Sequence, residues 1–194
     1  MRFAIFLLLM LFALAPGGLN SAFPVLANDD WSGAVNGLQA RLELVEKEMI
    51  NGTRRLTPYL ELRNVRDLGA QMEVNCDYRH LKLELVDANG SPLRDGWSSQ
   101  GGGPRSGPTQ ELNVIVLPWD SSIRLNLECR SWGVPKDAAA MVTADSGAWV
   151  IQENEKGKVY LRATLTGEKI EPSYNSWKRW SGKIQTAPLK VDWK

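Results

Sequence analysis

The feature of this sequence that most restricts its fold is a repeated alternation of apolar and polar residues. In the segment GLQARLELV (37–45), leucine or alanine occupies every second position. Successive side chains of a β-strand point to opposite faces, so this period predicts strands with one buried and one solvated face, as in antiparallel sheets. The same period recurs in four further segments: 55–64, 80–86, 122–129 and 158–165.

Turn residues separate these segments. Asn89-Gly90 predicts a hairpin of type I′, because both central residues of such a turn need positive φ. Asn51-Gly52 and the residues around Gly157 predict further turns. The stretch 98–109 is rich in Gly, Pro and Ser and predicts a long mobile loop.

Two segments depart from the alternation. Residues 112–117 are apolar on both parities, which predicts a central strand buried on both faces. Residues 131–147 show no strand pattern, and Pro135 is placed to open a short helical turn at 136–140. Seven or more strands at short spacing, with turn residues between them, predict an all-β fold built as a single antiparallel β-sandwich.

The N-terminal residues have the features of a secretory signal peptide. Arg2 gives a short positive start, and residues 3–15 form an unbroken apolar run. Such a run is too short to cross a membrane as a helix, and it has the length of a signal peptide's apolar region. The alternative is an uncleaved anchor. No other segment is apolar enough to hold the chain in a bilayer, so we expect no stable membrane span after cleavage.

The expected cleavage site follows Val25-Leu26-Ala27. An earlier site at Ala13-Leu14-Ala15 is poorer, because Pro16 follows it directly. The sequence therefore predicts a signal peptide at residues 1–27 and one domain at residues 28–194. That domain is expected to be secreted or periplasmic.

The charge balance restricts the classes of partner. The whole chain carries 23 Lys and Arg against 22 Asp and Glu. Residues 1–27 contain one cation, Arg2, and no anion, so the mature domain is formally neutral. A neutral domain lacks the long-range field that attracts nucleic acid or anionic lipid, so we expect neither as the principal partner.

The two cysteines, Cys76 and Cys129, each end an alternating segment on its apolar parity. Thiols can oxidise outside the cytoplasm, so a Cys76–Cys129 disulfide across the core is one candidate arrangement. Two buried free thiols are the other, since the sequence does not give the separation of their Cα atoms.

The sequence lacks the motifs of the common catalytic and metal sites. Its single histidine, His80, opens a strand on the exposed parity, and no partner ligands stand at metal-binding spacing. No nucleophile elbow, zinc-protease helix or phosphate-binding loop occurs. We therefore expect a non-enzymatic protein without a cofactor. An enzyme whose site no motif marks is the alternative.

Tryptophan is unusually frequent, with eight residues, several of them in or beside expected loops. Such rings can close the end of a core or contact a ligand. The segment YNSWKRWSGK (174–183) combines aromatic rings with cations, so it is either a binding surface or the approach to the last strand with one Trp covering the core. The candidate binding residues are Trp97, Trp177, Lys178, Arg179 and Trp180.

A resemblance to known domains adds to this interpretation. The segments YLELRNVRD, YRHLKLELVDANGSPLRDGWS and VLPWDSSIRLNL, and the closing AWVIQENEKGKVYLRATLTG and WSGKIQTAPLKV, follow one another in a recurring bacterial order. This order resembles the immunoglobulin-like sandwich of the intracellular proteinase inhibitor type and many secreted all-β domains of the bacterial envelope. It covers roughly residues 31–194. The resemblance implies an immunoglobulin-like β-sandwich and carries no catalytic residue across, because it consists of turn and core positions.

Together these features predict a non-enzymatic domain that binds a protein partner or supports the cell envelope. A carbohydrate-binding accessory module is one alternative, and it requires at least two exposed, coplanar Trp faces. A protease inhibitor is another, and it requires a rigid loop, for which residues 100–107 are a weak candidate because flexibility raises the entropic cost of binding. The expected partner is an envelope protein or a polysaccharide, and we expect a monomer.

Overall fold

The three-dimensional description comes from a computed structural model and covers residues 25–27, 30–76, 80–94, 114–128, 138–144, 147–167 and 178–193. Within these ranges the elements are strands, arranged in three sheets, and one 3₁₀ turn, η1 (Glu153–Glu155). The predicted all-β class is confirmed.

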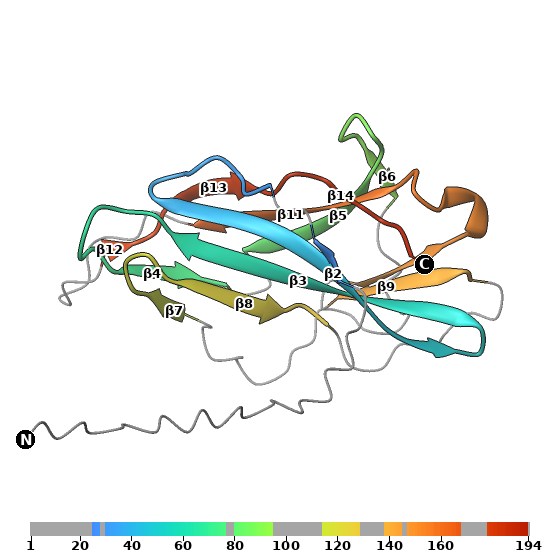
Figure 1. Cartoon of the computed structure of the whole chain (residues 1–194). Helices are drawn as coiled ribbons and strands as arrows, with labels where there is room; N and C mark the ends of the chain where they lie inside the picture. Colours follow the sequence, from blue (N-terminus) through green and yellow to red (C-terminus); the bar gives the residue numbers. More distant parts are fainter. Residues whose placement is uncertain are drawn as a thin grey trace, which may run out of the picture.

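The largest sheet has six strands in the order β1-β2-β3-β9-β10, with β8 also paired to β3 (Figure 1). Its longest strands, β2 and β3, form a hairpin whose turn residues Asn51 and Gly52 both have positive φ, the type I′ geometry. The turn predicted there is confirmed. The strands are β1 (Val25–Ala27), β2 (Leu38–Ile50), β3 (Thr53–Asn64), β8 (Ser122–Asn126), β9 (Ala140–Ala144) and β10 (Gly147–Ile151).

The other two sheets have five and three strands. The five-stranded sheet has the order β13-β11-β5-β6, with β14 also paired to β11, and the three-stranded sheet has the order β12-β4-β7. Their strands are β4 (Met72–Asn75), β5 (Leu81–Val86), β6 (Pro92–Arg94), β7 (Val114–Leu117), β11 (Tyr160–Gly167), β12 (Lys178–Arg179), β13 (Gly182–Gln185) and β14 (Leu189–Lys190).

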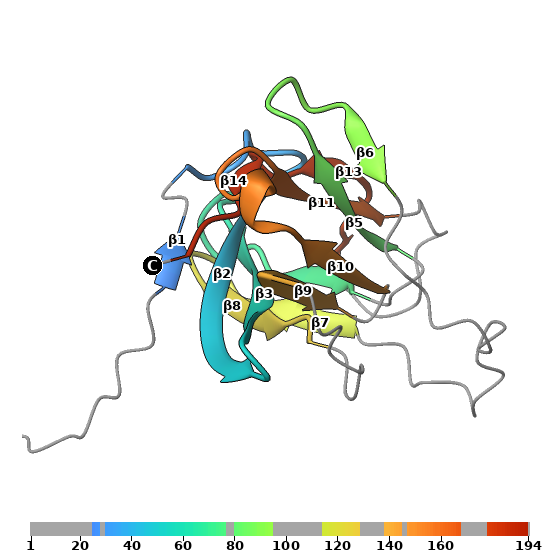
Figure 2. The same ribbon diagram turned by 90° about the vertical axis from the view of Figure 1, so that its right-hand side faces the viewer.

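One apolar core joins the sheets. The alternate residues of β2, β3 and β11 that the sequence marked as apolar are fully buried, and they belong to one cluster with residues of β4, β5 and β9. Seen in Figure 2, the strands of the two larger sheets lie in two layers that face this core. The period-two pattern therefore identified the inward face of these strands correctly.

Two neighbouring pairs of strands are parallel, contrary to the prediction of a purely antiparallel arrangement. β12 runs parallel to β4, and β9 runs parallel to Arg54–Leu56 of β3. The second half of β3, Tyr59–Arg63, pairs with β8 instead. Pro58 lies between these two halves, where its missing N–H removes no ladder bond, and its carbonyl accepts from Leu127 N at 3.0 Å.

Three local predictions are wrong. The described part of the segment 112–117 is β7, which pairs only with β4 among the described residues and exposes Val116, so it is an edge strand rather than a central one. Residues 136–140 do not form a helical turn as far as they are described, because Ala140 begins β9. All five residues of β9 are buried, so this strand has no wet face to produce alternation.

The turn at Asn89-Gly90 is not of type I′, because only Gly90 has positive φ. The carboxylate of Asp87 accepts from Asn89 N at 2.8 Å and from Ser91 N at 2.9 Å, which fixes a different turn. The type I′ signal applies instead at Asn36-Gly37, where both φ angles are positive.

Candidate functional site

The structure describes part of the predicted binding surface. Trp97 and Trp177 lie outside the described residues. Lys178 and Arg179 form β12. Arg179 is half-buried, and its Nε lies 3.5 Å from a carboxylate oxygen of Glu73 on the neighbouring strand.

Trp180 does not belong to a binding surface, which corrects the prediction for this residue. Its side chain is 1% exposed, and its Nε1 donates to the carbonyl of Val35 at 2.8 Å. The ring lies against the backbone of Gly167, where an added Cβ would come within 2.5 Å of the indole. Trp180 therefore covers the core and offers no ring to a ligand.

Cys76 is a free thiol, so the candidate disulfide is not formed at this residue. Burial raises its pKa to about 12, which keeps the thiol protonated and unreactive at neutral pH. Cys129 lies outside the described residues.

Four exposed large apolar residues belong to β7, to the β7–β8 turn and to the β3–β4 loop, segments that Figure 1 draws at the same end of the molecule as β4 and β12. They are Val65 (37% exposed), Leu68 (81%), Val116 (45%) and Trp119 (43%), and we call them the apolar end patch. Only Met49 and Leu93 are large, apolar and exposed elsewhere in the described residues. Single exposed apolar residues are ordinary, whereas a group at one end points to an interaction site.

One buried asparagine fixes the two loops that carry three of the four patch residues. Asn64 is fully buried, and its side-chain amide donates to the carbonyls of Ala70 (2.9 Å) and Leu117 (3.0 Å). Its backbone carbonyl accepts from Asp120 N at 3.1 Å. The β3–β4 loop, with Val65 and Leu68, is therefore tied to the turn that carries Trp119.

The turn itself holds the Trp119 side chain outward. Ser121 donates through its Oγ to the carbonyl of Pro118 at 2.6 Å, and Asp120 adopts a positive φ of 52°. A short turn closed by such bonds has few alternative conformations. An aromatic ring presented on it loses little conformational entropy on binding.

Arg179 lies in the same region as the patch. It pairs with Glu73 on β4, which pairs in turn with Val116 on β7. Directly paired residues share a face of the sheet, so an ion pair borders the exposed Val116. An apolar centre with charged residues at its margin is the usual composition of a protein interface.

Two other polar clusters are better explained as solvated sheet faces. On the β2–β3–β8 face, Arg41 contacts Glu61 at 2.6 Å, and both Arg41 and Arg63 lie over the ring of Trp31, at 4.8 and 4.4 Å from its centre. These charges largely neutralise one another. The face of Trp31 is already occupied by guanidinium groups, so it does not offer a free surface to a sugar.

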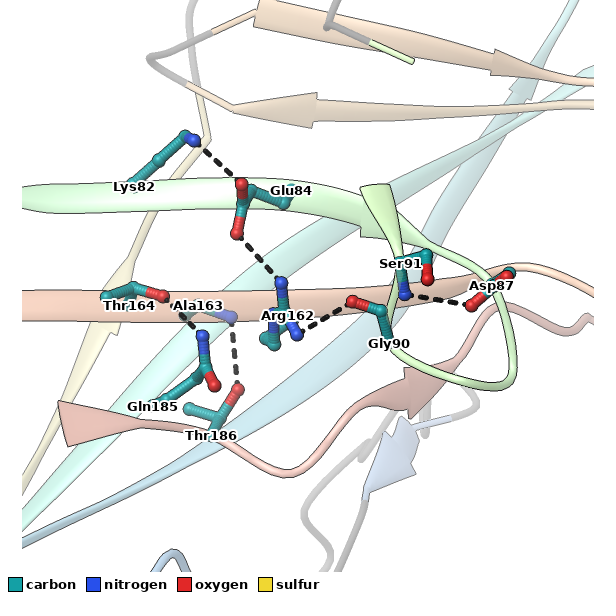
Figure 3. A network of polar contacts seen from close by, with 10 residues as sticks. All are labelled: Lys82, Glu84, Asp87, Gly90, Ser91, Arg162, Ala163, Thr164, Gln185 and Thr186. Atoms are coloured by element: carbon teal, nitrogen blue, oxygen red, sulfur yellow. Dashed lines mark hydrogen bonds and ion pairs between the residues drawn. The ribbon is translucent and has the colours of Figure 1, made fainter. Parts of the chain in front are cut away.

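The second cluster lies on the outer face of β5 and β11 (Figure 3). Glu84 accepts from Lys82 Nζ at 2.7 Å and from Arg162 Nη2 at 3.2 Å, and Arg162 also donates to the carbonyl of Gly90. The hydrogen bond from Lys82, followed by that from Arg162, lowers the pKa of Glu84 against the opposing effect of burial. These contacts tie β5, its turn and β11 together.

Within the described ranges, no three His, Cys, Asp or Glu side chains gather where they could hold a metal ion. The same ranges contain no helix with the length and apolar character needed to cross a bilayer.

The sequence contained a signal for the apolar end patch that the strand pattern did not use. Leu68 stands between Asp67 and Gly69, and Trp119 between Pro118 and Asp120. A large apolar residue among turn formers has no sheet face to bury it, so its exposure could have been expected.

Comparisons of the chain with protein-family models, with curated proteins and with solved structures found no match. Function therefore has to be inferred from the surface itself.

Proposed function

We propose that this protein is a non-enzymatic, secreted or periplasmic domain that binds another protein through the apolar end patch. The single observation that carries the proposal is the group of four exposed apolar side chains, one on β7 and three on the two loops that Asn64 joins. Leaving these side chains in water is unfavourable, and covering them with a partner recovers roughly 25 cal/mol for each Å² of apolar surface. Trp119 is the expected centre of the contact, since Trp is enriched among residues that dominate binding.

The fold that presents this patch is, in our proposal, an immunoglobulin-like β-sandwich. Support comes from the shared core of the two larger sheets. The parallel pair β3–β9 and the separate β12-β4-β7 sheet are additions to the simple antiparallel form. Export by a cleaved signal peptide remains a prediction from residues 1–27.

The test is a pull-down from the envelope fraction with the exported protein as bait. The double variant Leu68→Ala/Trp119→Ala is expected to lose specifically retained proteins, with affinity reduced by at least about tenfold for a dominant contact. Mass spectrometry of the retained proteins gives the readout. Circular dichroism should show an unchanged fold, because both side chains are exposed.

Met49→Ala provides a matched control. Met49 is 58% exposed and lies near the tip of the β2–β3 hairpin, at the opposite end from the patch (Figure 1). This variant should retain the same proteins as the unchanged chain. If the double variant also retains them, the end patch is not the binding surface.

Carbohydrate binding has weaker support. Trp119 is exposed, but Trp149, Trp180 and Trp193 are buried and the ring of Trp31 is covered by two arginines. The described residues thus provide no pair of free Trp faces. A loop for protease inhibition at residues 100–107 lies outside the described residues and stays a prediction.

A further inference from the structure

The outer edge of β2 is covered by two successive parts of the N-terminal chain. β1 pairs antiparallel with Glu43–Val45, with Leu26 opposite Leu44, and Figure 2 shows β1 at the margin of the sheet beside β2. Further along the same edge, Ser32 N donates to the carbonyl of Ala40 at 2.9 Å, and Ala40 N donates to Ser32 Oγ at 3.0 Å. β1 and Ser32 therefore occupy two successive stretches of the same edge of β2.

The backbone groups of Leu44 point toward this edge. At the open end of the β2–β3 hairpin, Val65 N donates to the carbonyl of Gly37 at 2.8 Å, so Gly37 and Val65 form a hydrogen-bonded pair. In an antiparallel ladder, hydrogen-bonded and non-hydrogen-bonded residue pairs alternate along the two strands. Leu44, which stands opposite Pro58, falls in a non-bonded pair with β3. Its N–H and C=O therefore face β1, as those of Ala40 face Ser32.

The predicted cleavage removes β1 from this edge. The last residue of β1, Ala27, is also the last residue of the predicted signal peptide. Ser32 belongs to the mature chain and keeps its bonds to Ala40. The edge at Glu43–Val45 then carries backbone groups with no strand partner, and such an edge can be paired by another chain.

We propose that the β2 edge at Glu43–Val45, uncovered by removal of the signal peptide, is a docking site for one extended segment of a partner protein. The segment is added antiparallel, in the place that β1 occupies. The proposal rests on the predicted export and on protein binding as the function. It adds a second contact, distinct from the apolar end patch.

The sheet specifies the chemistry of the docked segment. Directly opposed residues of an antiparallel pair share a face, and Leu44 faces the core with 0% exposure. The partner residue opposite Leu44 must therefore be apolar. Main-chain hydrogen bonds supply the affinity, as in other cases of strand addition.

The experiment uses the mature protein purified after export, with its N-terminus determined by mass spectrometry. The probe is a synthetic peptide with the sequence of residues 23–29, FPVLAND. NMR-detected hydrogen exchange is measured at the Leu44 amide with and without the peptide. We expect rapid exchange in the mature protein alone and at least about tenfold slower exchange at saturating peptide.

A peptide with an N-methyl group on Leu26 is the matched probe, because it keeps the side chains and removes one backbone donor. We expect it to bind about tenfold more weakly. Equal binding of the two peptides overturns the proposal. So does a mature N-terminus at or before Val25, since β1 then remains in place.

Protection of the Leu44 amide in the mature protein alone also overturns the proposal. It means that the chain itself or a second copy already occupies the edge. The Trp119→Ala variant is expected to bind the peptide as the unchanged protein does. Failure of edge pairing and failure of the end patch are thereby measured separately.

Discussion

Gly167 and Gly182 face each other across β11 and β13, and the ring of Trp180 lies against this pair. An added Cβ on Gly167 would come within 2.8 Å of the carbonyl oxygen of Trp180 as well as 2.5 Å of its ring. The two glycines therefore make the space that the indole fills. The sequence shows Trp180 beside Lys178 and Arg179 but does not show which distant residues leave room for it, so its burial could not be predicted.

Gly167→Ala should destabilise the protein by about 1–3 kcal/mol, because either the indole or the backbone must move to admit the methyl group. Chemical denaturation followed by Trp fluorescence measures the change. Gly33→Ala is the control, since an added Cβ there meets no atom within 4 Å and should change the free energy of unfolding by less than about 0.5 kcal/mol. Equal stability of the two variants would contradict this account of Trp180.

At the scale of strands, the sequence predicts elements with one wet face and fails for the others. β2, β3, β5 and β11 alternate because their two faces meet different environments. β9 is buried on both faces, and β7 is apolar on both parities although Val116 is exposed. An alternating sequence shows that the two faces of a strand meet different surroundings, one apolar and one wet. It does not report depth, so it cannot separate a central strand from an apolar edge strand.

The pairing of strands is also beyond local sequence. One edge of β3 pairs with β2, and the other edge pairs with β9 before Pro58 and with β8 after it. Pro58 is accommodated because it lies between these two partners. Nothing near Pro58 indicates this division, since the two partners follow much later in the chain.

The contacts of Glu84 between β5 and β11 should make stability depend on acid pH. The pKa of this carboxyl is lowered in the folded state, first by its hydrogen bond from Lys82, so its contribution is present above the ordinary value of 4.5. It is lost as the pH falls through the lowered pKa of the folded protein. The melting temperature should therefore decrease from about pH 5 downward.

Glu84→Gln should reduce this dependence on pH, and Lys82→Met should reduce it in the same sense by removing the largest cause of the shift. Calorimetry between pH 3 and 7 is the measurement. The effect should be partial, because the pKa values of Glu128 and Glu155 are lowered as well. A steeper loss of stability in Glu84→Gln would contradict the assigned direction.

At the scale of the whole molecule, the sequence predicts one residue at the margin of the candidate site and does not predict its centre. The cations and aromatic residues beside it in the chain predict a surface position for Arg179, and Arg179 pairs with Glu73, which pairs with Val116. Leu68 and Trp119 come together only because Asn64 ties two loops from different parts of the chain. A surface assembled by folding leaves no continuous motif, so the patch becomes visible only in three dimensions.

Refolding from denaturant should be slow for a domain of this size, in the range of milliseconds to seconds. The reason is that most sheet contacts join distant segments; Thr53 Oγ1, for example, donates to the carbonyl of Ala138, 85 residues later. Stopped-flow fluorescence provides the measurement. Complete refolding within microseconds would contradict the role of these distant pairings.

The position of β9 against the beginning of β3 has a consequence for biosynthesis. A ribosome that has made the β2–β3 hairpin must still add some 85 residues before the neighbour of Thr53 exists. During that interval the six-stranded sheet lacks β8, β9 and β10, so the chain that has been made can remain extended. If the signal peptide predicted at residues 1–27 directs export, this late closure suits passage through a translocation channel, which accepts an extended chain.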